Sequence, residues 1–200
     1  MWARLESNTI VEILTRPKAL NIGDVKYPSN IFSMWTNAEL AAIGIVPVTV
    51  DNTNLKDKEY YINTNQSFAY DTETGVATAS YGTATAKAIA DTLYTAQDET
   101  DGLGTEGEVR TRGLKYNHKE IINQQAAGIL QSTDWMIIRA ADGGTAVPSD
   151  ITTKRAAVRT KANAMCTQID AASDVDALAA LYVYNDATPP VRPLGELPTV

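Results

Sequence analysis

Two helical patterns joined by a tryptophan-bearing corner constrain this chain more than any other feature. The first pattern ends near Leu130, and Pro148 begins the second. Between them, Thr133, Asp134 and Trp135 form a polar corner with one large apolar side chain. Because tryptophan buries a large area at little cost in side-chain entropy, we expect Trp135 to be buried and to hold the corner against both helices.

Apolar residues recur at helical spacing on both sides of this corner. The first stripe comprises Leu114, His118, Ile121, Ile122, Gln125 and Ile129. The second comprises Ile151, Arg155, Val158, Ala162, Met165 and Ile169. These spacings predict a helical hairpin or bundle. The polar members allow two interpretations: they flank a monomeric core and extend outward to water, or they set the register where copies of the helices meet.

The first eighty residues carry strand patterns instead. We expect strands at residues 2–5, 9–14, 45–50, 60–62, 67–70 and 76–81. Ser7 and Asn8 supply the first hairpin turn, and the segment 71–75 supplies the last. Thr36 followed by Glu39 predicts a capping box at the start of a short helix. Together these patterns predict a small, mainly antiparallel β unit.

The predicted fold class is therefore α+β, in four parts. A mainly β unit with one short helix spans residues 1–82. A short alanine-rich helix (residues 83–94) and an acidic, glycine-rich linker make up residues 83–109. The helical region spans residues 110–187, and an extended arm spans residues 188–200.

The arm is predicted from its four prolines, which forbid a helix and disfavour a central strand. Val191, Leu194, Leu197 and Val200 recur at three-residue spacing, which places them on one side of a polyproline-like helix. Such a segment is already extended and loses little entropy on docking. The pattern favours a docking strip, with a mobile tail as the alternative.

Composition excludes several classes of partner. The formal net charge is −7, and no cluster of lysine and arginine occurs, which argues against binding to nucleic acid or to an anionic membrane. No apolar run approaches the length of a membrane span. The single cysteine, Cys166, excludes an intrachain disulfide. The start of the chain lacks a signal-like apolar region, so we expect folding in a reducing cytoplasm.

The sequence offers little for catalysis. His118 is the only histidine, and its place on a helical stripe predicts a packed residue rather than a general base. A dinucleotide-like spacing of glycines at residues 102–107 lacks a preceding strand and lies among acidic residues, so we predict no cofactor. Glu99, Asp101 and Glu108 match part of a calcium-binding loop, with a solvated acidic loop as the favoured alternative.

The corner resembles a motif of bacteriophage tail-fibre assembly proteins and related small tail proteins, including those of marine phages. The matching residues are Leu130, Thr133, Asp134, Trp135, Pro148, Arg155 and Arg159. The N-terminal segment 1–12 and the segment 35–45 are similar to other parts of the same class. The resemblance covers roughly half the chain and contains no catalytic signature. It implies a role in the virion or in its assembly, after synthesis in the host cytoplasm.

These observations predict a non-enzymatic structural component of a phage tail, in a tail fibre, baseplate or connector, that binds other tail proteins and forms homo-oligomers. The expected partner-binding residues are Trp2, Trp35, Trp135, Arg155, Val191, Leu194 and Leu197. A tail-fibre assembly chaperone is one alternative. Another is a small glycan-binding domain for host attachment, with Tyr60, Tyr61, Tyr70 and Tyr81 as stacking platforms.

Overall fold

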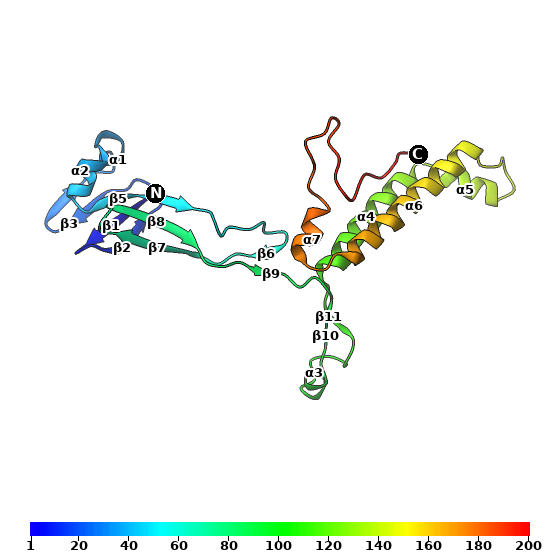
Figure 1. Cartoon of the computed structure of the whole chain (residues 1–200), viewed down its shortest axis with the longest axis horizontal. Helices are drawn as coiled ribbons and strands as arrows, with labels where there is room; N and C mark the ends of the chain where they lie inside the picture. The colour runs from blue at the N-terminus through cyan, green and yellow to red at the C-terminus, as the bar shows by residue number, and fades with distance from the viewer. The chain divides into compact units, whose positions relative to one another are not determined.

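The computed structural model describes all 200 residues, and it confirms a mixed fold of helices and strands. The chain divides into two compact units, residues 1–85 and residues 86–200. Figure 1 shows the strand-rich unit in blue to cyan-green and the helical unit in green to red. Each unit has its own elements and its own buried side chains, so each is described separately.

The first unit is built on a five-stranded sheet. Its strands are β1 (Trp2–Glu6), β2 (Thr9–Leu14), β5 (Ile45–Asp51), β7 (Gln66–Asp71) and β8 (Val76–Tyr81), in the order β2-β1-β5-β8-β7. The hairpin pairs β1–β2 and β7–β8 are antiparallel, as predicted, and β1 also pairs with β5 in antiparallel fashion. The central pair β5–β8 is parallel, which the sequence did not predict. The sheet is therefore mixed, and β5 lies between its two hairpins, antiparallel to β1 and parallel to β8.

Local turn chemistry closes both hairpins. Ser7 and Asn8 have φ angles of 49° and 61°, which is the left-handed geometry of a tight primed hairpin turn. Gly75 closes the β7–β8 hairpin with a φ of 70°. Both predicted turns are confirmed, because each depends only on residues adjacent in sequence.

A short helical segment covers the apolar cluster of this unit. It consists of α1 (Ile31–Met34) and α2 (Asn37–Ala42). The predicted capping box is present: the Thr36 N–H donates to Glu39 Oε2 at 2.7 Å, and the Glu39 N–H donates to Thr36 Oγ1 at 3.3 Å. The buried cluster beneath comprises Leu14, Leu20, Ile31, Leu40 and Ile45. Two short pairs complete the unit: β3 (Leu20–Ile22) with β4 (Val25–Tyr27), and β6 (Tyr61–Ile62) with β9 (Thr85–Ala86).

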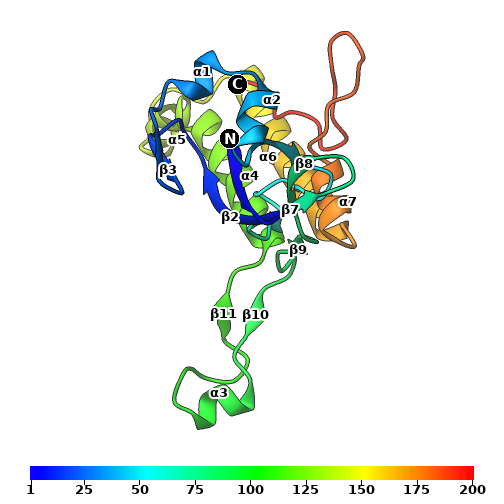
Figure 2. The same ribbon diagram turned by 90° about the vertical axis from the view of Figure 1, so that its left-hand side faces the viewer.

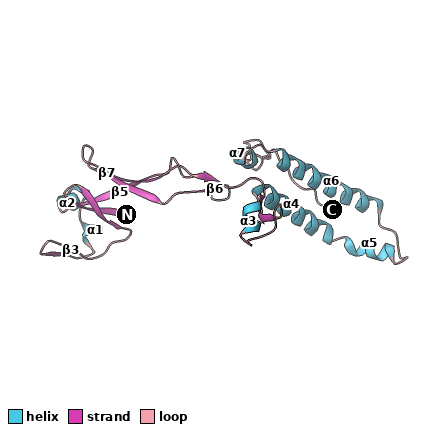
Figure 3. Cartoon of the chain, turned by 90° about the horizontal axis from the view of Figure 1, so that it is seen from below, coloured by secondary structure: helices cyan, strands magenta, loops and turns pink.

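The second unit is dominated by a helical hairpin. The helix α4 (Leu114–Gln131) lies beside α6 (Ser149–Ala171), with α5 (Asp134–Ala141) at the far end (Figure 3). A fourth helix, α7 (Val175–Ala180), follows α6. The predicted helix boundaries near Leu130 and Pro148 are confirmed. None of the helices is long and apolar enough to cross a bilayer.

The α4–α6 seam buries most of the second predicted stripe and half of the first. On α6 the buried residues are Arg155, Val158, Ala162, Met165 and Ile169, while Ile151, the first residue of that stripe, is half-buried. On α4 they are Leu114, His118, Ile122 and Ala126. The first stripe is therefore shifted: Ala126 faces the core, while Gln125 and Ile121 face solvent. The core position is therefore filled by a small apolar residue, next in sequence to the glutamine that the stripe predicted.

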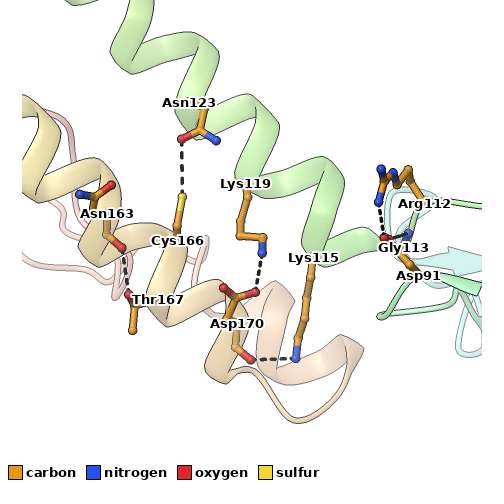
Figure 4. Close-up of polar contacts among 10 residues, drawn as sticks. All are labelled: Asp91, Arg112, Gly113, Lys115, Lys119, Asn123, Asn163, Cys166, Thr167 and Asp170. Atoms are coloured by element: carbon orange, nitrogen blue, oxygen red, sulfur yellow. Dashed lines mark hydrogen bonds and ion pairs between the residues drawn. The ribbon is translucent and has the colours of Figure 1, made fainter. Parts of the chain in front are cut away.

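Polar contacts line the edge of this seam (Figure 4). Lys119 Nζ lies 2.8 Å from Asp170 Oδ1, and Lys115 Nζ donates to the backbone oxygen of Asp170 at 2.8 Å. One turn further on, Cys166 Sγ lies 3.8 Å from Asn123 Oδ1. The pKa of the Cys166 thiol is raised, chiefly by burial, so the thiol stays protonated and packs as a small side chain.

Residues 83–94 were predicted to be helical, and this prediction is wrong. They hold β9 and β10 (Thr92–Leu93), and β10 pairs with β11 (Val109–Thr111) in a narrow hairpin carrying α3 (Ala96–Thr100) beyond its strands (Figure 2). The backbone oxygens of Ala88 and Ile89 accept the N–H groups of Leu114 and Lys115 at 3.0 Å. An extended segment therefore satisfies the first turn of α4, whose N–H groups have no partner within the helix.

The last twenty residues carry no helix or strand. They turn back on themselves, because the Asn185 N–H donates to the Val191 oxygen at 2.9 Å. The Leu194 N–H donates to the Leu181 oxygen at 3.0 Å, and the Leu194 side chain is fully buried. The segment is therefore attached to its own unit through Leu194. Its role as a docking arm stays a prediction.

Candidate protein-interaction surface

Arg155 fixes the corner between the two long helices. Its Nη1 donates to the backbone oxygen of Leu130 at 2.7 Å and to Thr133 Oγ1 at 2.6 Å. Its Nη2 donates to Asp134 Oδ1 at 2.7 Å. One guanidinium from α6 thus binds the end of α4 and the start of α5. Its fork of donors suits this task, since several acceptors can be held at once.

The burial of Arg155 corrects two expectations. The residue is 8% exposed, so it does not extend outward from the core, and it presents little surface to a partner. Thr133 is also buried, at 7%. Arg155 and Thr133 therefore contribute mainly to the fold, because their hydrogen bonds set where α5 begins after α4.

Trp135 does not clamp the corner, contrary to prediction. Its side chain is 53% exposed and lies in the first turn of α5. Ile137 is 42% exposed and Ile138 is 62% exposed, and α5 has no buried residue at all. We call Trp135, Ile137 and Ile138 the α5 apolar surface. A short helix that exposes three of its large apolar side chains is unusual on a monomeric protein.

Arg139 lies against this surface. Its guanidinium carbon is 4.9 Å from the centroid of the Trp135 ring, close enough for a cation–π interaction. Both side chains come from one face of α5, one turn apart. The tryptophan ring thus has one intramolecular contact on this face of the helix, and the residue stays 53% exposed.

The other two tryptophans expose less of their side chains to a partner than Trp135 does. Trp2 and Trp35 are half-buried and pack against the apolar cluster of the first unit. The Trp2 ring lies 4.7 Å from the Phe32 ring, and the Trp35 ring lies 5.8 Å from that of Tyr27. Their main contribution is therefore to the fold. Their role in partner binding stays a prediction for the exposed part of each ring.

The C-terminal residues predicted to bind partners have different surroundings. Leu194 is fully buried in its own unit and presents no surface. Leu197 is half-buried, whereas Val191 is 52% exposed and lines a shallow pocket with Val183 and Tyr184. The three residues therefore do not form one exposed strip, because the turn before Leu194 breaks the polyproline-like spacing.

His118 is packed, as predicted. It is 3% exposed, and its Nδ1 lies 2.9 Å from the hydroxyl oxygen of Tyr182. The two rings are also in contact, with centroids 4.9 Å apart. The imidazole thus joins α4 to the segment after α7, and it is not open to a substrate.

The acidic candidates for calcium do not converge. The Glu99 carboxylate accepts the Glu106 N–H at 3.2 Å, and Asp101 accepts an amide N–H of Gln97 at 2.9 Å. No group of three or more potential ligands forms anywhere in the chain. These carboxylates instead order the loop beyond β10 and β11.

The four tyrosines proposed as stacking platforms do not form one surface, because their surroundings differ. Tyr60 is buried, and burial, followed by the nearby Glu59 and Asp57, raises the pKa of its hydroxyl to about 12. Tyr70 packs against the buried residues of the sheet. Tyr61 and Tyr81, in contrast, line one pocket. The sequence pattern did not reveal this pocket, because the pairing of β7 with β8 brings Tyr81 next to Gln66 and the residues before it.

Comparison with known proteins assigns no family to the chain. Models of protein families, curated proteins and solved structures were each compared with it, and none matches. The resemblance of residues 130–159 to small phage tail proteins therefore stays a prediction from sequence.

Proposed function

We propose that this chain is a non-enzymatic structural component of a bacteriophage tail, and that it binds other tail proteins, including its own copies, through the α5 apolar surface. The resemblance at residues 130–159 supports the tail assignment. The exposure of Trp135, Ile137 and Ile138 on one short helix supports the binding role. This exposure is the observation on which the proposal depends.

The energetics of the surface suit protein binding. Removing apolar area from water contributes roughly 25 cal/mol per Å2, so covering three large side chains yields several kcal/mol. Tryptophan and arginine are the residue types that most often dominate binding at interfaces, and Trp135 and Arg139 lie together here. The surface therefore has the composition of an interface centre.

Preorganisation adds to this argument. Arg155 holds both Thr133 and Asp134, so the first turn of α5 is fixed before any partner arrives. A surface that is already ordered loses less conformational entropy on binding than a mobile one. The buried arginine and the exposed tryptophan thus act together, although only the second would contact a partner.

Mass spectrometry of purified phage particles tests the assignment directly. Stoichiometric presence of the chain in particles is expected. Its absence from particles, combined with failure of fibre assembly when the gene is disrupted, would replace the proposal with the assembly-chaperone alternative.

A pair of matched variants tests the surface. Ile138→Glu should prevent incorporation into particles, because burying a carboxylate at an interface without a partner is costly. Met34→Glu is the control, since Met34 is 73% exposed on α1 in the other unit. Normal incorporation of the Ile138→Glu chain would exclude the α5 apolar surface as a contact.

A further inference from the structure

The first unit contains a pocket with the chemistry of a saccharide-binding site. The pocket has a volume of about 530 Å3, within the range of roughly 300–1,000 Å3 common for small-molecule sites. Its polar and aromatic lining consists of Tyr61, Asn63, Thr64, Asn65, Gln66 and Tyr81, and Leu55, Lys58 and Ile62 complete it. We propose that this pocket binds a saccharide. The inference goes beyond the tail role and does not depend on it, because every lining residue belongs to the first unit.

The floor of the pocket is an extension of the core face of the sheet. Gln66 and Tyr81 are directly paired across β7 and β8, so their side chains lie on the same face. Continuing along β8, the same face carries Ala79 and then Ala77, which are both fully buried. Gln66 and Tyr81 are only half-buried. The face therefore changes from a closed apolar core to an open polar pair at the end of the strands.

The wall of the pocket is held by its own hydrogen bonds. The Asn63 amide closes the preceding loop, since its Oδ1 accepts the Lys56 N–H at 2.9 Å and its Nδ2 donates to the Lys56 oxygen at 2.7 Å. Thr64 Oγ1 accepts the Gly82 N–H at 2.7 Å, which attaches the wall to the end of β8. The pocket is therefore formed before a ligand enters, which lowers the entropic cost of binding.

The lining offers amide groups to a ligand. The side chains of Asn65 and Gln66 take no part in the bonds that hold the wall, and each amide can both donate and accept. Ligand hydroxyls have the same dual capacity. Tyr61 and Tyr81 also line the pocket. Lys56 Nζ lies 5.8 Å from the centroid of the Tyr61 ring, so Tyr81 is the residue that we assign to stacking. A sugar ring presents hydroxyls at its edge and C–H groups on its face, so it matches the amides and the Tyr81 ring at once.

Other ligand classes fit this lining less well. A purely apolar ligand would leave the amides of Asn65 and Gln66 without partners, at a cost of about 1–3 kcal/mol for each buried group. A phosphate-bearing ligand requires several cationic donors, and Lys58 is the only charged residue in the lining. The mixture of neutral amides and aromatic rings thus favours a saccharide.

Saturation-transfer NMR on the full chain tests the inference with D-glucose, D-galactose, N-acetyl-D-glucosamine and N-acetylneuraminic acid as probes. Transfer to at least one sugar is expected, and its pattern across the panel identifies the preferred class. Absence of transfer to all four at millimolar concentration would overturn the proposal. A negative result in this sugar-binding experiment would not change the result of the particle-incorporation experiments. The saccharide site and the tail role can therefore be contradicted independently.

Variants locate the site. Gln66→Ala and Tyr81→Ala should each weaken binding by about tenfold or more, through loss of a hydrogen bond and of a stacking face. Tyr116→Ala is the matched control, because Tyr116 is a partly exposed tyrosine (36%) on α4 in the other unit. Asn65→Ala, at an exposed position before β7, provides the test if Tyr81→Ala fails to fold. Undiminished binding in folded variants would contradict this placement.

Discussion

Arg155 on α6 donates a 2.7 Å hydrogen bond to the backbone oxygen of Leu130 at the end of α4. Carbonyl groups in the last turn of a helix have no partner within the helix. Here the Leu130 oxygen accepts the Thr133 N–H at 3.1 Å and, in addition, the side chain from the neighbouring helix. The same guanidinium also binds Thr133 and Asp134 at the start of α5. The corner between the helices is thus defined by hydrogen bonds and not by tryptophan packing.

Replacing Arg155 with methionine should destabilise the second unit by roughly 1–3 kcal/mol, because the buried Thr133 hydroxyl would lose its donor and the Leu130 oxygen would lose one of its donors. Asp134 adds little to this figure, since its side chain is 51% exposed and screened by water. Chemical denaturation measures the loss. Arg159→Met, at an exposed position one turn further along α6, should change stability by less than about 0.5 kcal/mol. Equal effects of the two variants would contradict the role of Arg155.

Trp135→Ala should leave thermal stability nearly unchanged. The sequence alone would predict a loss of roughly 3–5 kcal/mol for a buried tryptophan. At 53% exposure the ring makes few contacts to lose, apart from its interaction with Arg139. Ile122→Ala on α4 is the comparison, because Ile122 is 1% exposed and its truncation should cost roughly 2–5 kcal/mol. A large drop in melting temperature for Trp135→Ala would mean that the side chain is buried in solution.

Features that depend on neighbouring residues could be predicted from the sequence. The Ser7–Asn8 turn and the Thr36–Glu39 capping box each involve residues at most three positions apart. The α6 stripe was equally accessible, because helical periodicity alone places Val158, Met165 and Ile169 on one face.

Features that depend on contacts between residues far apart in the sequence could not be predicted. The parallel pairing of β5 with β8 joins segments more than twenty residues apart, and nothing in either strand specifies the direction of its neighbour. Residues 83–94 have alanine-rich helical propensity, but their backbone is used to satisfy the start of α4. Tertiary context overrides propensity in this segment. The sequence also did not predict that Gln66 lies beside Tyr81, because this neighbourhood depends on the register between β7 and β8.

The base of the β10–β11 hairpin should weaken in acid. The pKa of Asp91 is lowered from its ordinary value of 3.8, first by the Gly113 N–H that donates to the carboxylate at 2.7 Å, and then by Arg112. A lowered pKa in the folded chain means that the ionised form is favoured by folding. The contribution is therefore complete above the ordinary pKa and is lost as the pH falls toward the lower, folded pKa.

The Asp91→Asn variant makes this acid dependence measurable. The stability of the original chain should exceed that of the variant at neutral pH, and the two should converge as the pH falls below the ordinary aspartate pKa. Amide exchange at Gly113 provides the local measurement, since that N–H is the largest cause of the shift. A stability difference that stays constant over the acid range would show that the Asp91 carboxylate is not selectively stabilised.

The C-terminal segment should contribute to the stability of the second unit, because Leu194 is fully buried and its backbone oxygen accepts a 2.9 Å hydrogen bond from Lys161 Nζ on α6. From the proline-rich sequence alone, removal of residues 188–200 would be expected to leave the fold nearly intact. The structure instead predicts that Leu194→Ala costs roughly 2–5 kcal/mol, as for other buried leucines.

Val191→Ala is the matched control in the same segment, since Val191 is 52% exposed and its truncation should cost less than about 0.5 kcal/mol. Denaturant unfolding of the two variants distinguishes the cases: equal midpoints would mean that the segment is unattached in solution and available as an arm.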